Sequence, residues 1–404
     1  MSSKSSFYKN SGILIFTQML IIGVPFLYYP YLINSFSASS YGEVLYAQII
    51  ISLFSVVIDF GFFLTGTKSI SENIENKTTR CEVFSTIISL KVAIFSLLAL
   101  LILSLWLYLP YTPYVNYIAI LIIFLMGDSI SPNWLYNAYE KNYYFSLATL
   151  FQKMLVLSYV LLFIDNNSSI SSFVFFISNA HFISNAIMLF VFVRKFDFRF
   201  VKPTKASIIL EVKSAFNIFL SKLSTILFLK GNGIVVGHFL GFRDVAIYNF
   251  SERIISIFLM PINMINQALF PRVAKDKDYV FVYKVIGLLL LISLLGYPIV
   301  VSYLPMLINF YVGPELKEAA DVIIGMYMLV PISIVSFFLG NCILINKNLK
   351  KQFSMSIHIG AITYFVGIGI LLCFSITIES LVFCLIISSL TTLTIRLLST
   401  VRCR

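Results

Sequence analysis

The sequence contains few charged residues for its length. Only 12% of its 404 residues are Asp, Glu, Lys or Arg, whereas 59% are hydrophobic, and the mean hydropathy is +0.92. A soluble domain carries roughly 25% charged residues, so about half of the charge that a water-facing surface needs is missing. The composition excludes a soluble enzyme, a disordered chain and a nucleic-acid-binding protein. It predicts an all-α polytopic membrane protein.

Residue patterns that carry catalytic or metal chemistry are also scarce. The five cysteines form no Cys-x-x-Cys pair, so no disulfide framework or metal site is expected. The three histidines, His181, His238 and His358, lie in three different apolar segments without ligand-like spacing. Asp276-Lys277-Asp278 matches the Asp-x-Asp pattern of glycosyltransferases, but no domain surrounds it, and a solvated turn is favoured. No Walker-type phosphate loop occurs, so we expect neither ATP nor any cofactor.

Long apolar runs fill most of the chain. A helix needs about 20 mostly apolar residues to cross the hydrocarbon core of a bilayer. Twelve segments meet this requirement: 11–33, 44–66, 84–108, 115–139, 143–164, 172–193, 214–239, 246–270, 283–304, 319–345, 353–374 and 379–400. The sequence therefore predicts about 12 transmembrane helices.

The distribution of Lys and Arg predicts the orientation of these helices. The N-terminus, the even-numbered connections and the C-terminal end, including Arg396, together hold 22 of these residues, whereas the odd-numbered connections hold only Arg243 and Lys317. Because positive residues remain in the cytoplasm, both termini are expected to be cytoplasmic. The basic connection 194–213 then separates a six-helix bundle at 1–193 from a second one at 214–404. Matched halves are common in transporters, with the substrate site between them.

Eight charged residues interrupt the predicted spans: Asp59, Lys91, Asp128, Lys153, Lys222, Lys230, Glu252 and Arg253. At about 3 kcal/mol each, eight lipid-facing charges would cost roughly 24 kcal/mol of insertion. Most of them must therefore face protein or water.

The depth of these residues separates their possible roles. Lys91 and Lys222 lie about two turns from the cytoplasmic ends, where long lysine side chains snorkel to the interface. Lys153 and Lys230 are too deep for that, so they line a polar cavity or form an ion pair with Asp59 or Asp128. Adjacent Glu252 and Arg253 point in different directions, so partners on other helices are expected.

Polar residues accompany the charges in spans four and seven. Asn133, Asn137 and Glu140 would form one helical stripe next to Trp134. Gly231-Asn232-Gly233 suggests either an irregular helix beside a cavity or close helix packing. We predict a substrate cavity lined by Lys153, Lys230, Lys222, Arg253, Asn133, Asn137 and Trp134. Asp59 and Asp128 are candidates for ion coupling, with ion-pair or packing roles as the alternative.

The net charge of the spans suggests the kind of substrate. The eight intramembrane charges sum to +2, and a pathway lined in this way would accept an anionic group such as a phosphate or pyrophosphate. The alternative is that this balance means little until the residues that meet water are known.

Several motifs resemble the polysaccharide-transporter branch of the multidrug/oligosaccharidyl-lipid/polysaccharide exporter superfamily. They are Lys9-Asn10-Ser11, Pro30-Tyr31-Leu32, Tyr41-Gly42, Ala47-Gln48, Asp59-Phe60-Gly61, Thr67-Lys68-Ser69-Ile70-Ser71, Pro132 with Trp134, Leu135 and Glu140, and Gly237-His238-Phe239-Leu240-Gly241 with Tyr248. The resemblance covers roughly residues 8–275. The chain departs from the family at Asn232, near which an acidic residue is frequent, and at Asn137-Ala138, where Gln-Gly is usual.

The resemblance implies a V-shaped exporter-like architecture and a flippase, not an enzyme. Such a protein moves undecaprenyl-diphosphate-linked O-antigen repeat units from the cytoplasmic to the periplasmic leaflet of the bacterial inner membrane. Membrane lipids, an O-antigen polymerase and a chain-length regulator are the implied partners, without nucleic acid. A drug or metabolite exporter of the same superfamily, a membrane-embedded glycan polymerase and a non-transporting assembly partner are the alternatives.

Overall fold

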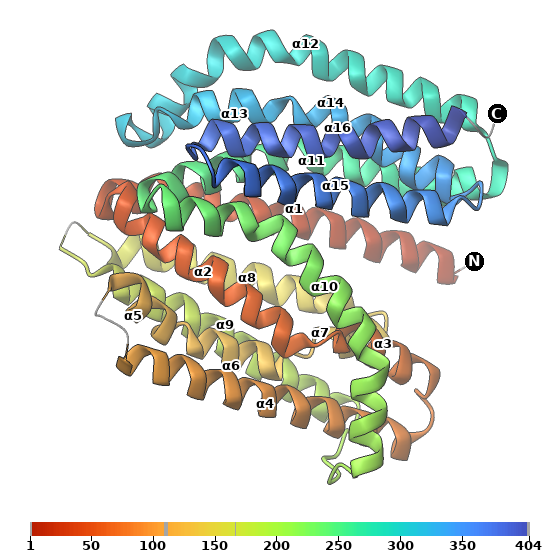
Figure 1. The fold of residues 1–404 in the computed structure, drawn as a ribbon. Helices are drawn as coiled ribbons and strands as arrows, with labels where there is room; N and C mark the ends of the chain where they lie inside the picture. The colour runs from red at the N-terminus through yellow and green to blue at the C-terminus, as the bar shows by residue number, and fades with distance from the viewer. Residues whose placement is uncertain (1, 109–111, 166, 402–404) are drawn as a thin grey trace. The chain divides into compact units, whose positions relative to one another are not determined.

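The computed structural model describes residues 2–108, 112–165 and 167–401, and these segments fold into helices (Figure 1). Twelve of the described helical segments are long and apolar enough to cross a membrane. Each overlaps one of the twelve runs found in the sequence, so the prediction of a twelve-span all-α membrane protein is confirmed. The chain divides into two compact units, residues 1–234 (unit 1) and 235–404 (unit 2).

Helices of unit 1 pack against partners that are distant in the sequence. The helices of this unit are α1 (Ser2–Phe36), α2 (Ala38–Asp59), α3 (Phe62–Glu72), α4 (Lys77–Tyr108), α5 (Pro113–Ile120), α6 (Ile122–Ile130), α7 (Asn133–Ala138), α8 (Asn142–Phe163) and α9 (Ile170–Lys195). Helix α1 packs along α8, α6 along α9, and α3 against α7. The pairing of α1 with α8 brings residues more than a hundred positions apart into one bundle.

Two spans of unit 1 are interrupted. Between α2 and α3, Phe60 and Gly61 adopt left-handed backbone angles, with φ of 44° and 84°, and the chain bends there without leaving the span. Between α6 and α7, Pro132 lacks the N–H that would continue the helix, and Ser131 is already extended, with ψ of 122°. Both breaks place polar backbone groups next to the charged residues described below.

The core of unit 1 is aromatic near the break at Pro132. Trp134, Phe62, Phe192, Phe84 and Phe198 are all buried in one cluster. Gly66 allows the indole to pack closely, because an added Cβ would lie 2.7 Å from Trp134 Cε3. This packing fixes the neighbouring ends of α3, α4, α7 and α9.

The connection after α9 is more ordered than a linker. Lys77 forms an ion pair with Asp197, and the Val201 N–H donates to Ser85 Oγ at 2.8 Å. Helix α10 (Lys205–Phe239) then starts well before residue 214. The boundary between the two compact units falls inside this helix, after Ile234; the six-plus-six division at 194–213 remains a prediction.

Helix α10 passes through Gly231-Asn232-Gly233 without interruption. The expectation of an irregular helix there is therefore wrong. A Cβ on Gly233 would lie 2.5 Å from Ile49 Cδ1 of α2, and Asn232 is only 1% exposed. Close packing accounts for these small residues.

Unit 2 contains α11 (Phe242–Asp276), α12 (Tyr279–Val312), the short η1 (Pro314–Leu316), α13 (Ala319–Tyr327), α14 (Leu329–Phe337), η2 (Phe338–Ile345), α15 (Lys350–Leu371) and α16 (Ile378–Val401). Helices α15 and α16 pack along each other, and α11 packs against α13. The segment η2 is a π-helix, a conformation that is rare and frequently lies at functional sites.

Candidate functional site

Asp59 and Lys222 form an ion pair within the apolar spans of unit 1. Asp59 is the last residue of α2, and Lys222 lies in α10. Lys222 Nζ lies 2.7 Å from Asp59 Oδ2, and the two side chains are 32% and 27% exposed. Lys222 Nζ also lies 5.3 Å from the centre of the Phe63 ring. Because Asp59 neutralises the charge of Lys222 within the span, this lysine does not need to extend to the membrane interface.

Asp128 is held by two neighbouring helices. Its Oδ2 accepts a hydrogen bond from Ser55 Oγ of α2 at 2.5 Å, and its Oδ1 lies 2.8 Å from His181 Nε2 of α9. The His181 ring stacks on Phe124 at 3.8 Å, and Asn185 Nδ2 donates to the His181 carbonyl at 3.0 Å. The imidazole is thus fixed in position to donate to the carboxylate.

Lys91 completes this group of charges. Its side chain in α4 is 3% exposed and donates to the Ser131 carbonyl, at 3.4 Å, where the break before Pro132 frees that oxygen. Asp59, Asp128 and Lys222 all interact electrostatically with it. The snorkelling interpretation is wrong for Lys91, because the side chain is enclosed by protein.

We call Asp59, Asp128, Lys91, Lys222 and His181 the charge network. Its two carboxylates and two lysines carry formal charges that balance. Such a network of charges can exchange partners when helices move; ion coupling at its carboxylates remains a prediction. Among the described residues, no group of three or more His, Cys, Asp or Glu side chains could hold a metal ion.

The polar residues of span four do not form the single helical stripe that the sequence predicted. Trp134 is 2% exposed and packed in the aromatic core. Asn137 Nδ2 donates to Thr67 Oγ1 at 3.4 Å, and Asn137 Oδ1 accepts from Asn142. Asn133 is partly buried. Glu140 is exposed with φ of 56° and lies beyond the end of α7, so the expected stripe through Glu140 is wrong.

The remaining predicted cavity residues lie in three helices. Lys153 in α8 and Lys230 in α10 are both partly buried, and both take part in polar or electrostatic contacts. Arg253 in α11 donates from Nε to Asn249 Oδ1 at 2.8 Å, one turn earlier on the same helix. The charge network therefore brings together Asp59, Asp128 and Lys222 of the predicted set, while the cavity itself remains a prediction.

Arg396 was assigned to the basic C-terminal end by the charge count, but α16 buries it. It is 5% exposed; its Nη1 donates to the Ser336 carbonyl at 2.7 Å, and its Nε donates to Ser356 Oγ at 3.0 Å. A Cβ on Gly340 would lie 2.7 Å from Nη1. The sequence signal that could have revealed this is the position of Arg396 inside the run 379–400.

Glu211 also escaped the sequence analysis, because the seventh span was expected to start at residue 214. In the structure it lies in the second turn of α10 and is 3% exposed. Its spacing from Ala215, Ile218 and Lys222 could have revealed it, since positions three or four apart share one helix face.

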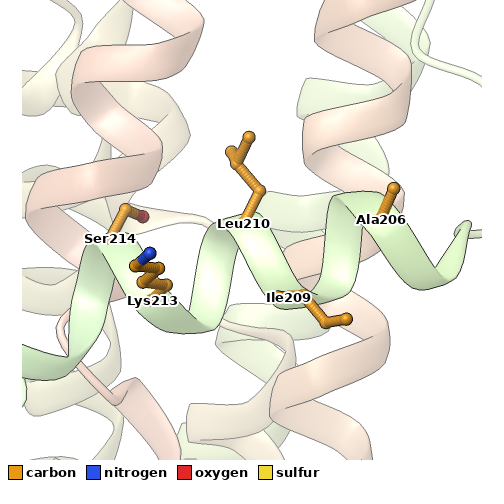
Figure 2. A pocket seen from close by; sticks show the side chains of 5 residues that line it. All are labelled: Ala206, Ile209, Leu210, Lys213 and Ser214. Carbon is orange, nitrogen blue, oxygen red and sulfur yellow. The ribbon is translucent and has the colours of Figure 1, made fainter.

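The hollow in Figure 2 is no candidate for a polar substrate site. It has a volume of about 450 Å³ and is lined only by Ala206, Ile209, Leu210, Lys213 and Ser214 of α10. Ala206, Leu210 and Ser214 project from the same side of the helix (Figure 2). Ile209 and Leu210 are 66% and 65% exposed, as expected for side chains that meet lipid.

The fold is similar to that of solved membrane transporters. The structure resembles the inward-facing conformation of a multidrug resistance MATE family transporter of the MOP superfamily, with a TM-score of 0.70, 12% identity and 94% of each chain covered. It also resembles the lipid II flippase MurJ in an inward closed conformation, with a TM-score of 0.72, 12% identity and 97% and 87% of the two chains covered.

The sequence identifies the family within this class. Residues 7–277 match the family described as polysaccharide biosynthesis protein, and the chain belongs to that family. A protein of Escherichia coli (strain K12) named "Putative O-antigen transporter" is 23% identical over 360 residues, covering 87% of each chain. A protein of the same name from Shigella dysenteriae is 24% identical over 344 residues, covering 84% of this chain and 86% of that one. The predicted family is confirmed: the chain is a multi-pass membrane transporter, not an enzyme.

Proposed function

We propose that this protein is a flippase for undecaprenyl-diphosphate-linked O-antigen repeat units. It moves them from the cytoplasmic to the periplasmic leaflet of the bacterial inner membrane by alternating access. The observation that carries the proposal is the set of charged side chains, above all the charge network, held inside the spans of a polysaccharide-family chain. Intramembrane charges are costly and usually mark a transport pathway.

The chemistry of the substrate fits the intramembrane cations. A pyrophosphate group needs positive, hydrated surroundings to cross the membrane, while the polyprenyl tail can stay in the lipid. Lys153 and Lys230 are the intramembrane cations outside the charge network in unit 1, and both are partly buried. We assign them to the pyrophosphate pathway.

The membrane potential can contribute to the transport energy. Moving one elementary charge through 100 mV is worth about 2.3 kcal/mol. A substrate with about two negative charges would therefore gain roughly 4–5 kcal/mol on outward passage through an inside-negative membrane. Asp59 and Asp128 are the groups that would couple an additional ion.

Glycan display in a flippase-null strain tests the proposal. The wild-type chain should restore display of a lipid-linked glycan. Lys153→Ala and Lys230→Ala should reduce it strongly, and the corresponding Arg variants should retain more. Lys213→Ala is the matched control, because Lys213 is an exposed lysine on the same helix as Lys230; its display should stay normal.

Protein abundance must be measured with each variant, since losing a partner of a buried charge can also destabilise the fold. Normal display by both Ala variants at normal abundance would reject the role of these lysines. If the wild-type chain restores no display but expels cationic dyes, the protein is a drug exporter of the same fold.

A further inference from the structure

Glu211 is a buried carboxyl group on the face of α10 that packs against the rest of unit 1. Ala215, one turn later on the same face, is fully buried, and a Cβ on Gly61 would lie 2.9 Å from its carbonyl oxygen. One helical turn before Glu211, Ser207 contacts α4 through a 3.2 Å hydrogen bond from Thr86. Glu211 therefore lies between two points where α10 touches its neighbours.

No described group satisfies this carboxyl. Its Oε2 is buried and has no hydrogen-bond partner among the residues that the structure describes. The neighbours one turn away on α10 are Ser207, Ile208, Ser214 and Ala215, none of them charged. The Ser214 hydroxyl donates to the backbone carbonyl of Glu211, at 2.9 Å, and not to its side chain.

Two charged side chains on the adjacent elements, Asp59 and Lys91, have partners elsewhere. Asp59 at the end of α2 is paired with Lys222. On α4, Glu82 precedes Thr86 by one turn, and Lys91 donates to the Ser131 carbonyl. Within the described part of the chain, the buried Glu211 side chain forms no ion pair.

An ionised carboxylate with one oxygen buried and unpartnered loses much of its hydration without a compensating hydrogen bond at that oxygen, whereas a protonated carboxyl is neutral. We propose that Glu211 is a proton-binding site: it holds a proton while this face of α10 is packed, and it releases the proton to water when α10 moves during transport. The O–H bond of the carboxylic acid forms and breaks with water as the only other reactant. The N-terminal end of α10 follows the basic connection that the charge pattern places in the cytoplasm, so the proton is exchanged with that side.

This inference rests on the proposed function only for the motion of α10; the bound proton itself can be detected without any substrate. Infrared spectroscopy of the purified protein in lipid at neutral pH should show the carbonyl band of a buried carboxylic acid. Glu211→Gln, an uncharged replacement of the same shape, should lose this band. Glu72→Gln is the matched control, because the Glu72 side chain is 62% exposed, and it should keep the band. An unchanged spectrum in Glu211→Gln would overturn the inference.

A second measurement on the wild-type chain covers the case in which Glu211→Gln does not fold. Dicyclohexylcarbodiimide, an apolar reagent, adds to protonated carboxyl groups and can be located by peptide mass spectrometry. We expect Glu211 to be modified at neutral pH, and the modification to fall when the pH is raised. No modification of Glu211 would contradict the inference. Glycan display by the wild-type chain reports separately on the proposed function.

Discussion

At the residue scale, the intramembrane charges of unit 1 are organised by pairing. The sequence predicted that most of the eight charges must face protein or water, and the structure shows Asp59 and Asp128 in contact with side chains of other helices. For Lys222 the sequence favoured snorkelling to the interface, whereas the structure pairs it with Asp59. The sequence could not predict the partners, because Lys222 lies 163 positions from Asp59 and only the tertiary fold brings them together. Likewise, nothing in the local sequence of His181 indicated that it would meet a carboxylate of another helix.

The Asp59–Lys222 pair should contribute measurably to stability. We expect Asp59→Ala and Lys222→Ala each to lower the free energy of unfolding, and the double variant to lose less than the sum, with an interaction energy of about 1–2 kcal/mol. The Lys68–Glu72 pair is the control, since its side chains are 76% and 62% exposed at 3.9 Å, and its interaction energy should be at most about 0.5 kcal/mol. Thermal unfolding of the purified variants measures both. Strict additivity at Asp59 and Lys222 would show that the contact is unimportant.

The contact between Lys77 and Asp197 should make the attachment of the 196–204 connection dependent on pH. The hydrogen bond from Lys77 lowers the pKa of Asp197 below its usual value. A carboxyl whose pKa is lower in the folded state stabilises that state above its unfolded pKa, and this contribution is lost as the pH falls through the folded value.

Asp197→Asn should therefore loosen the connection at neutral pH. It should have no effect in strong acid, where Asp197 of the wild-type protein is protonated in both the folded and the unfolded state. Limited proteolysis after Arg199 at neutral pH, together with unfolding at low pH, measures this difference. Equal protease sensitivity of the two proteins at neutral pH would be evidence against the anchoring role of Asp197.

At the scale of the elements, hydropathy predicts where helices lie but not where they break. All twelve spans were predicted because each contains an apolar run of sufficient length. The interruptions at Phe60–Gly61 and Ser131–Pro132 depend on backbone angles and on packing around Trp134. The early start of α10 was missed because Lys205, Glu211 and Lys213 lower its hydropathy, although its buried face continues through Glu211.

The π-helix η2 should be sensitive to side chains near Arg396. In Gly340→Ala, the new Cβ would lie 2.7 Å from Arg396 Nη1 and 2.9 Å from the Phe353 ring. We expect a loss of about 1–3 kcal/mol of stability from this overpacking. Gly369→Ala in α15 is the matched control, because nothing lies within 4 Å of its added Cβ, and it should be neutral or stabilising by up to about 1 kcal/mol. Equal melting temperatures for the two variants would mean that η2 adjusts freely.

At the scale of the whole molecule, the charge distribution predicts the topology. In a Cys373→Ser background, which removes an exposed cysteine, Lys202→Cys should react only with reagents that reach the cytoplasm. Asn167→Cys, in an exposed turn between α8 and α9, should react from the periplasm. The reverse labelling pattern would show that the protein has the opposite orientation in the membrane, and it would contradict the proposed direction of transport.

The central claim is that the protein transfers a lipid-linked oligosaccharide between leaflets. The most direct measurement uses vesicles that contain the purified protein and a fluorescent undecaprenyl-diphosphate oligosaccharide, with a membrane-impermeant quencher to report the leaflet. We expect transfer in the presence of the wild-type protein, much slower transfer with Lys153→Ala or Lys230→Ala, and acceleration by an imposed potential. Transfer no faster than in protein-free vesicles, under any imposed potential or proton gradient, would contradict the claim.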